Sequence, residues 1–427
     1  MSIDTDTVSL LSTYVMPTYA RFPVTAARGE GSWLWDEEGK SYLDFCTGIA
    51  SCSLGHAHPL LRNALEAQAA TLWHCSNLYA TRPQAELARF LVETAAGLPG
   101  KVFFSNSGAE ANDGLIKAAR RYGHARPNAD GTPRTLILTF KQSFHGRTLG
   151  GIAATGQDKV KEGFDPLLPG FQHLPFNDLA AVAGAMADGG VVAVLVEAIQ
   201  GEGGVNVAGA EFLLGLADLC RRHDALLLFD EVQCGLGRTG DWCGWRTVLG
   251  REAARVRPDG MSWAKGLGGG FPIGAFWLGE RPVADGMPLH DLLGAGSHGS
   301  TFGGTPLASA VALAVVREIE SAGLPAHVRA IGARLEAGLL ALCSPMVRGT
   351  RGHGLLLGIV VDPAAVAASS LPEAATPALR VVHACLREGL LVPPAGPEVV
   401  RLLPALNVSE AEADEALAIL GRVLAGG

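Results

Sequence analysis

Short runs of Val, Leu, Ile and Phe recur along this chain, and several of them end in polar residues. The clearest run, residues 225–229, is Ala-Leu-Leu-Leu-Phe, and Asp230 follows it directly. Further strands are expected at residues 102–105, 134–140, 191–197, 271–278, 355–361 and 399–403, with helices such as 84–92 and 109–121 between them. Uninterrupted apolar runs alternating with amphipathic helices are typical of buried parallel strands joined by crossover helices. The sequence therefore predicts an α/β fold with a mainly parallel sheet sandwiched by helices.

Polar clusters follow three of these expected strands, at residues 105–108, 197–204 and 230–233. Ligands of open α/β sheets bind outside the carboxyl ends of the strands, so the three clusters predict one shared site. After about residue 306 the pattern changes to longer helices rich in Ala and Leu, with short strands. We expect a large domain at residues 56–305 and a smaller α+β domain at residues 306–427, to which residues 1–55 contribute. Residues 363–376 are expected to form a flexible surface insert.

Composition excludes several classes of protein. The 427 residues carry 34 Lys and Arg against 42 Asp and Glu, a formal net charge of −8, with no basic run of the kind that nucleic-acid binding needs. No stretch is long and apolar enough to span a membrane, and the N-terminus lacks the pattern of a signal peptide. The eight cysteines are scattered without a CxxC pair, and His56 and His58 have no further ligands at a suitable spacing. We expect a cytoplasmic protein with reduced thiols and no metal.

One turn and two single residues of the sequence suggest chemistry. The turn Ser-Asn-Ser-Gly at residues 105–108 precedes a helix, so its amides and Ser107 are placed to bind an anion, although Ser107 is equally suited to cap the helix. Lys265 lies among small residues; in a desolvated pocket it would be a nucleophile, and on the surface it would have no special role. Asp230 is either a cap or a fixed negative charge for a cofactor nitrogen. An anion cradle, a nucleophilic lysine and a strand-end aspartate are together what pyridoxal phosphate requires.

Residues 235–240 offer an alternative, because Gly-Leu-Gly-Arg-Thr-Gly matches the G-x-G-x-x-G pattern of dinucleotide sites. The residues that follow do not resemble the start of a long helix, which would leave a pyrophosphate without helix amides. An NAD-dependent oxidoreductase is therefore kept only as a remote alternative.

An ordered set of motifs extends nearly from end to end and resembles the class III, fold-type-I aminotransferases, especially those that act on N-acetylornithine. The motifs occupy residues 28–36, 55–59, 76–79, 105–112, 144–148, 197–205, 229–240, 264–274, 299–306 and 401–404. Each motif alone is unspecific, but their combination and order are highly specific. The resemblance implies a pyridoxal 5'-phosphate enzyme that works as a homodimer with shared active sites.

The resemblance also implies a role for individual residues. Lys265 would form the Schiff base and shuttle the proton, and Asp230 would keep the pyridinium nitrogen protonated. The cofactor phosphate would be bound by Ser107, Gly108 and Ala109. Phe144 and Val232 would cover the two faces of the cofactor ring, and Gln233 would reach its hydroxyl. Thr301 would reach the phosphate of the cofactor that is bound to the neighbouring subunit.

Substrate contacts are implied in the same way. Arg147 would clamp a carboxylate through two parallel hydrogen bonds, and an ion pair with a surface acid is the less favoured alternative. Glu202 and Arg401 would pair while the amine donor is bound and separate when 2-oxoglutarate needs Arg401. Ser300 would lie beside the substrate, and Tyr19 would contact it in several members of the family.

The resemblance implies transfer of the δ-amino group of N2-acetyl-L-ornithine to 2-oxoglutarate, a reaction of arginine biosynthesis, in two alternating half-reactions. Relatives that use free ornithine have a tyrosine in place of Ile49, and isoleucine fits the acetylated donor. Donors that stay open are ornithine, succinylornithine, succinyldiaminopimelate, 4-aminobutyrate and a carrier-bound lysine.

Overall fold

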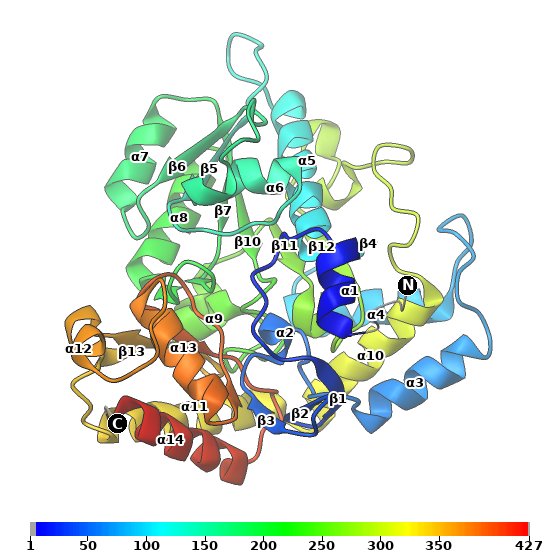
Figure 1. The fold of residues 1–427 in the computed structure, drawn as a ribbon. Coiled ribbons are helices and arrows are strands. Elements are labelled where there is room, and N and C mark those ends of the chain that lie inside the picture. The colour runs from blue at the N-terminus through cyan, green and yellow to red at the C-terminus, as the bar shows by residue number, and fades with distance from the viewer. Residues whose placement is uncertain (1–5, 426–427) are drawn as a thin grey trace.

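A seven-stranded sheet lies at the centre of the computed structural model, which describes residues 6–425 except the side chain of Asp285 (Figure 1). The strand order is β4-β12-β11-β10-β7-β5-β6. Neighbours among β11, β10, β7, β5 and β6 pair in parallel, whereas β12 runs antiparallel to both β11 and β4. The bounds are β4 Gly100–Ser105, β5 Leu136–Phe140, β6 Phe171–Leu174, β7 Val191–Val196, β10 Leu226–Asp230, β11 Gly260–Trp263 and β12 Gly274–Gly279. The predicted α/β fold with a mainly parallel sheet is confirmed.

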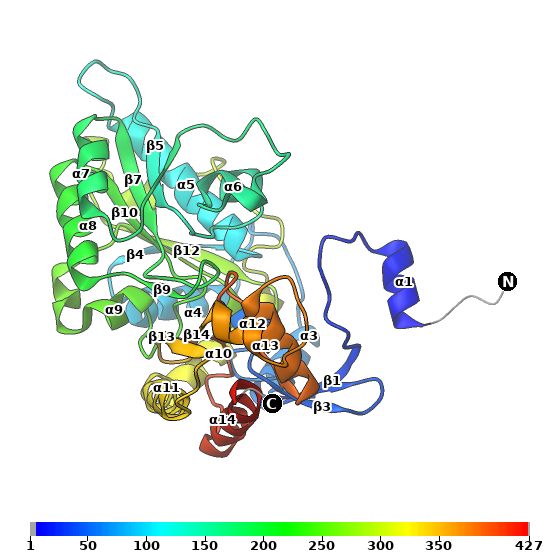
Figure 2. The ribbon, with the colours of Figure 1, turned by 60° about the vertical axis from the view of Figure 1, so that its left-hand side comes forward.

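Helices cover both faces of this sheet, with α5 (Gly108–Ala125) and α6 (Leu149–Ala154) on one face and α7 (Leu179–Ala187) and α8 (Ala210–Arg222) on the other (Figure 2). Strand β10 shows why both faces are apolar. Leu226 and Leu228 belong to the cluster that contains the buried side of α5, whereas Leu227 and Phe229 belong to the cluster that contains α8. Successive strand residues point to opposite faces, so a strand covered on both sides must be apolar at every position.

Two smaller sheets complete the fold. The first has the order β1-β2-β3-β15 and joins the N-terminal strands to a strand near the C-terminus, and the second is the antiparallel sheet β13-β14-β16. Their strands are β1 Ala26–Glu30, β2 Trp33–Asp36, β3 Ser41–Asp44, β13 Val347–His353, β14 Leu356–Val361, β15 Leu390–Leu391 and β16 Val399–Leu402; β8 (Ile199–Gln200) and β9 (Asn206–Val207) form a separate hairpin.

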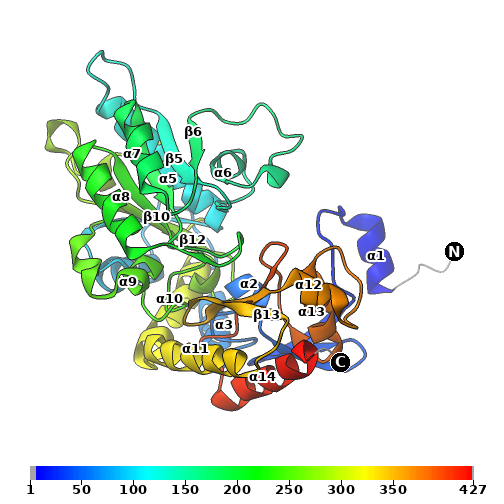
Figure 3. The same ribbon diagram turned by 90° about the vertical axis from the view of Figure 1, so that its left-hand side faces the viewer.

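The remaining helices are α1 Thr7–Tyr14, α2 Thr47–Ala50, α3 Pro59–Ala69, α4 Arg82–Phe90, α9 Gly244–Leu249, α10 Pro306–Ser321, α11 Leu324–Ala341, α12 Pro363–Ala368, α13 Pro377–Arg387 and α14 Glu410–Leu424. Helix α1 buries none of its side chains and stands away from the body of the chain (Figures 2 and 3). Within residues 6–425, no helix combines the length and apolar composition needed to cross a bilayer.

Several expected elements differ from those observed. Strands β6 and β11 were not predicted, because each has only four residues and neither forms a long apolar run. The expected strand at residues 271–278 begins at Gly274, and the strand expected from residue 134 begins at Leu136. The segment 363–376, expected to be a flexible surface insert, begins with the short helix α12. Asp362 caps this helix by accepting hydrogen bonds from the Ala364 and Ala365 amides. The last helix, α14, begins with a capping box formed by Ser409 and Glu412.

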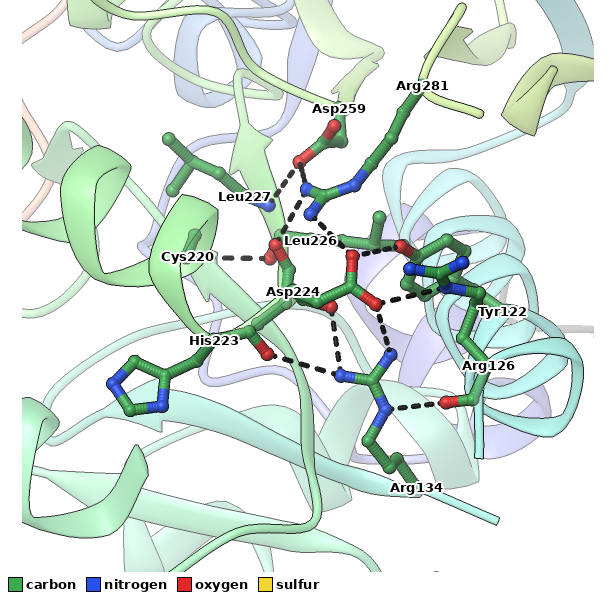
Figure 4. Close-up of polar contacts among 11 residues, drawn as sticks. Tyr122, Arg126, Arg134, Cys220, His223, Asp224, Leu226, Leu227, Asp259 and Arg281 are labelled. Atoms are coloured by element: carbon green, nitrogen blue, oxygen red, sulfur yellow. Dashed lines mark hydrogen bonds and ion pairs between the residues drawn. The ribbon is translucent and has the colours of Figure 1, made fainter. Parts of the chain in front are cut away.

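A network of ionic hydrogen bonds joins the chain segments at the edge of the sheet where β10 begins (Figure 4). Asp224, in the turn before β10, accepts from Tyr122 Oη at 2.7 Å, Arg281 Nη2 at 3.0 Å, Arg134 Nη2 at 3.1 Å and Arg126 Nε at 3.2 Å. Burial alone would raise the pKa of Asp224, but the Tyr122 hydroxyl and the charges of Arg281 and Arg126 hold it below its usual range. One carboxylate thus links the end of α5, the segment before β5, the turn before β10 and the segment after β12.

Replacing Asp224 by alanine should lower the free energy of unfolding by about 2 kcal/mol, because three guanidinium groups and a phenol lose their shared acceptor. A carboxyl group with a lowered folded-state pKa stabilises the fold above its unfolded-state pKa, and this contribution disappears as the pH falls through the folded-state value. The difference between the wild type and Asp224→Ala should therefore shrink on acidification. Urea unfolding at neutral and acidic pH measures both effects.

The matched control is Asp414→Ala, which removes an exposed carboxylate that pairs with Arg334 at 2.6 Å. Exposed pairs of this kind contribute less than about 1 kcal/mol. Equal losses in the two variants at neutral pH would contradict the role assigned to Asp224.

Candidate active site

A cavity of about 390 Å³ lies where β4, β5, β7, β10 and β11 end. Its walls come from the segments that directly follow these strands, from residues 270–273, which precede β12, and from Ser51. The structure brings together here the following residues that the sequence singled out: Ser107, Gly108, Ala109, Phe144, Arg147, Glu202, Asp230, Val232, Gln233 and Lys265. Parallel strands place their carboxyl ends at one edge of the sheet, which explains why segments so distant in sequence meet.

The first turn of α5 forms one wall of the cavity. Ser107 is the N-cap residue, and its Oγ accepts from the Glu110 amide at 3.2 Å, as the capping interpretation of this serine predicted. In the part of the chain that the structure describes, the amides of Gly108 and Ala109 have no acceptor. Unpaired amides at the positive end of a helix dipole are suited to bind a phosphate. A side chain at residue 108 would obstruct this wall, because a Cβ atom would lie 2.7 Å from Cγ1 of Val232.

Asp230 lies at the end of β10 and is buried. Its Oδ2 accepts from Asn112 Nδ2 at 2.7 Å and lies 2.8 Å from Nδ1 of His145, and its Oδ1 accepts from the Val232 amide at 3.0 Å. A buried carboxylate needs such partners, since an uncompensated charge in a protein interior is costly. These contacts fix the carboxylate at the cavity wall, where it can face a positively charged ring nitrogen.

Lys265 follows β11 and adopts a left-handed backbone conformation with φ of 42°. Its Nζ lies 3.8 Å from Oε1 of Glu202. Burial lowers the pKa of Lys265, although the charge of Glu202 acts in the opposite direction. The neutral amine, which is the nucleophilic form, is therefore more accessible than in an exposed lysine.

Glu202 and Arg401 form a bidentate ion pair, with Nη1 to Oε1 at 2.8 Å and Nη2 to Oε2 at 3.2 Å. Gln233 joins them, accepting from Arg401 at 2.7 Å and donating to Glu202 at 3.0 Å. Arg401 is only 1% exposed. Burial would raise the pKa of Glu202, but the charges of Arg401 and Lys265 outweigh it and lower the pKa to about 2. Arg401 itself does not line the cavity and reaches it through Glu202 and Gln233.

Phe144 and Arg147 lie on the segment after β5. The Phe144 amide donates to Oε1 of Glu197 at 2.8 Å, which ties this segment to the end of β7. Arg147 is exposed, and its Cζ lies 5.2 Å from the centre of the Phe144 ring. No acidic group among residues 6–425 forms an ion pair with Arg147, so the alternative of a surface ion pair finds no support.

Besides Arg401, three of the predicted site residues lie outside the cavity. Ser300 is adjacent to it and accepts from Asn106 Nδ2 at 3.0 Å. Thr301 lines a separate small cavity together with Tyr79. Tyr19 is 75% exposed and lines an apolar cavity between the N-terminal segment and β15. Within this chain, the structure does not bring Tyr19 or Thr301 to the site.

Sequence reasoning assigned no role to Asn112, His145 or Glu197. All three lie inside motifs that carry the family resemblance, at residues 105–112, 144–148 and 197–205, and this position could have indicated that they belong to the site. Burial of Glu197 and the nearby charge of Asp230 raise the pKa of Glu197 well above its ordinary value. Residues 235–240, the G-x-G-x-x-G match, form turns, and the helix α9 that follows after three residues has only six residues. The described residues contain no cluster of His, Cys, Asp and Glu that could hold a metal ion.

The cavity fits pyridoxal phosphate by the chemistry of its walls. Free helix amides, a buried carboxylate and an amine of lowered pKa all belong to residues that line it. The lack of a side chain at Gly108 keeps space beside Val232. These groups match the phosphate, the ring nitrogen and the aldehyde of the cofactor, respectively.

Comparisons with known proteins agree with this assignment. The family model described as aminotransferase class-III matches residues 14–424. Acetylornithine aminotransferase from Gloeobacter violaceus is 47% identical over 96% of this chain and 96% of its own, and that from Synechocystis sp. is 44% identical over 97% and 92%.

Solved structures are similar over nearly the whole chain as well. N-acetylornithine aminotransferase from Stenotrophomonas maltophilia has a TM-score of 0.78 and 35% identity, covering 98% of both chains. Ornithine aminotransferase from Toxoplasma gondii has a TM-score of 0.87 and 30% identity, covering 98% of this chain and 94% of its own. None of these relatives supports the alternative of an NAD-dependent oxidoreductase.

Glu202→Gln should lower the free energy of unfolding by about 3 kcal/mol at neutral pH, because it leaves the buried Arg401 without its carboxylate. The folded-state pKa of Glu202, about 2, is below its ordinary value of 4.5. Its stabilising contribution is therefore complete above about pH 4.5 and is lost as the pH falls toward 2. Unfolding curves of the wild type and the variant should converge as the pH falls through this range.

Glu388→Gln serves as the control, since Glu388 pairs with the exposed Arg422 at 3.1 Å. Its effect should remain below about 1 kcal/mol. A loss in Glu202→Gln no larger than that of the control would show that the buried pair does not stabilise the fold.

Proposed function

Because this chain belongs to the class-III aminotransferase family, we propose that it moves the δ-amino group of N2-acetyl-L-ornithine to 2-oxoglutarate. The products are N-acetylglutamate 5-semialdehyde and L-glutamate, and the reaction belongs to arginine biosynthesis. The observation that carries the proposal is the arrangement of Lys265, Asp230 and the first turn of α5 around one cavity. The donor is taken from the acetylornithine aminotransferases that are 44% and 47% identical to this chain.

Pyridoxal phosphate, when bound, supplies an aldehyde that links covalently to amines and a ring that accepts electrons from the substrate carbon. The amides of Gly108 and Ala109 and the Ser107 hydroxyl would hold its phosphate, and Asp230 its ring nitrogen. Phe144 and Val232 would cover the two ring faces, and Gln233 would reach the ring hydroxyl. Lys265 would bind the aldehyde.

Once a substrate amine has replaced Lys265 on the aldehyde, the released Lys265 amine would move the proton. Burial lowers the pKa of Lys265, so the neutral form of its Nζ is more accessible than in an exposed lysine. In that form it accepts a proton from the substrate carbon that bears the amino group and later releases it. Efficient general bases have a pKa near the working pH, and the direction of this shift brings the lysine closer to that range.

Two arginines recognise the substrates in different ways. Arg147 is exposed beside the cavity and has no acidic partner within residues 6–425, so it can bind a substrate carboxylate in both half-reactions. Arg401 is paired with Glu202, which neutralises it while the amine donor is bound. The second carboxylate of 2-oxoglutarate would replace that of Glu202 on Arg401.

Free ornithine is the second candidate donor, because the Toxoplasma gondii ornithine aminotransferase has the higher TM-score of the two solved structures, 0.87 against 0.78. Sequence identity favours the acetylated donor, with 35% for the N-acetylornithine enzyme against 30% for the ornithine enzyme. Succinylornithine, succinyldiaminopimelate and 4-aminobutyrate carry similar charged groups and belong in the same test.

Steady-state kinetics with these donors and 2-oxoglutarate should give the highest kcat/KM for N-acetylornithine, by at least about tenfold, which corresponds to about 1.4 kcal/mol of transition-state binding. Lys265→Ala should lose turnover and Lys159→Ala, which removes an exposed lysine, should keep it. A higher kcat/KM for free ornithine would overturn the donor assignment. Undiminished turnover by Lys265→Ala would overturn the mechanism.

We further infer that the protein works as a homodimer, in the cytoplasm. An exposed apolar patch supports this inference and consists of Leu72, Trp73, Leu78, Tyr79 and Phe302. The two segments that carry it are in contact, since Asn77 Nδ2 donates to the Gly303 carbonyl at 2.9 Å. Apolar patches of this kind mark protein interfaces. Thr301 lies beside the patch, where it would reach the phosphate bound by a second copy.

Leu78→Glu should shift the wild-type dimer toward monomer in sedimentation equilibrium, because it places a charge in the patch at a side chain that is 87% exposed. Leu340→Glu makes the same change at an exposed leucine of α11, outside the patch, and should leave the dimer intact. A wild-type chain that sediments as a monomer would contradict the proposed dimer.

A further inference from the structure

A second large cavity, of about 470 Å³, lies at the opposite edge of the central sheet from the active site. It is formed by the end of α8, the start of β10, the segment before β11 and the end of β12. Asp259 and Arg281 line it and belong to the ionic network around Asp224 (Figure 4). This cavity is larger than the active-site cavity, and the proposed aminotransferase reaction makes no use of it.

The two cavities are separated by the length of the strands. Leu227 lies at the second cavity, and Asp230 at the end of the same strand lies at the active site. Likewise, Asp259 lies at the second cavity just before β11, and Lys265 lies at the active site after β11 ends. Ile273 lies at the active site just before β12, and Gly279 lies at the second cavity at the end of β12. At about 3.3 Å per strand residue, the sites are about 10 Å or more apart. A ligand in the second cavity would therefore occupy its own site.

The second cavity is rich in arginine. Arg221, Arg255, Arg257 and Arg281 line it, against two acidic residues, Asp259 and Glu280. Asp259 already accepts from Arg281 at 3.0 Å and from the Leu227 amide at 2.9 Å.

Three of the arginines have partners and one does not. Arg221 pairs with Asp218, Arg255 with Glu252 at 2.6 Å, and Arg281 with Asp224 and Asp259. Arg257 is exposed and forms no hydrogen bond or ion pair within the described part of the chain. A guanidinium group offers several donors in a planar fork that fits carboxylate and phosphate oxygens. Arg257 is thus free to bind an anion at the mouth of the cavity.

Apolar groups form much of the remaining wall, including Trp277, Leu227, Ala217 and three prolines at positions 99, 258 and 282. Trp277 is 1% exposed, and its Nε1 has no hydrogen-bond partner among the residues described. A carbon skeleton or ring would pack against this wall, whereas a bare inorganic anion would contact only the arginines.

We propose that this cavity is a binding site for a small organic anion, in which Arg257 holds a phosphate or carboxylate group and the apolar wall contacts the body of the ligand. The site is independent of the aminotransferase reaction. It takes small molecules, because a volume of about 470 Å³ is in the range of cofactor and metabolite pockets.

Isothermal titration of the cofactor-loaded enzyme tests the proposal, with the phosphate cradle of the active site already filled. The probes are phenyl phosphate, benzene-1,3,5-tricarboxylate and inorganic phosphate. At least one aromatic probe should bind with a Kd below about 1 mM, and inorganic phosphate should bind more weakly. Comparing the two aromatic probes shows whether the site prefers phosphate or carboxylate.

Arg257→Gln should weaken binding of the aromatic probe at least about fivefold, because it removes the unpaired guanidinium group. Arg251→Gln is the matched control; Arg251 is exposed on the same segment, lies outside the cavity and should not affect the affinity. Equal affinities in the wild type and both variants would overturn the proposal. The absence of binding up to about 10 mM in the wild type would overturn it as well.

Discussion

The burial of the Asp230 carboxylate is the constraint on which the geometry of the active site depends. A carboxylate at the end of an apolar strand must be compensated by nearby donors, and the chain supplies them from two other segments. Asn112 comes from α5 and His145 from the segment after β5. Through Asn112 the charge helps to fix the first turn of α5, with its free amides, and through His145 it fixes the segment that carries Phe144 and Arg147. The groups that would hold a ring nitrogen, a phosphate and a substrate carboxylate are therefore positioned by one buried charge.

Acidic side chains are unusually dense around this point. Glu197 and Glu231 are both buried next to Asp230, and burial raises the pKa of each, to about 8 for Glu231. Glu231 accepts from the amides of Gly244 and Trp245 and thereby holds the start of α9. The negative charges oppose the lowering of the pKa of Lys265, yet burial prevails. A positively charged ring beside Asp230 would compensate this buried carboxylate, which is a physical reason for the site to bind a cationic cofactor.

The parts of the fold that could be predicted from the sequence are those specified by neighbouring residues. Strand β10 is a continuous apolar run, and the strand-turn-helix at Ser107 combines a small-residue turn with a capping side chain. The partners of Asp230 could not be predicted in this way, because Asn112 and His145 lie 118 and 85 residues away in sequence. Strand β11 was missed for a related reason: its four residues gain their stability from β10 and β12 on either side, which no local pattern records. The arginines of the second cavity are likewise scattered over residues 221–281 and meet only in the folded chain.

The different burial of Arg147 and Arg401 would allow one pocket to serve the two proposed substrates. Arg401 is buried, and in a medium of low polarity its charge must always be balanced, either by Glu202 or by a substrate carboxylate. Exchange of one carboxylate for another leaves the arginine compensated, so its free-energy cost is small compared with that of an unpaired charge. Arg147 is exposed, and water solvates it when no substrate is present, so it needs no protein partner. In the proposed reaction, a donor with one suitably placed carboxylate would therefore need only Arg147, whereas 2-oxoglutarate, with two carboxylates, would engage both arginines and displace Glu202.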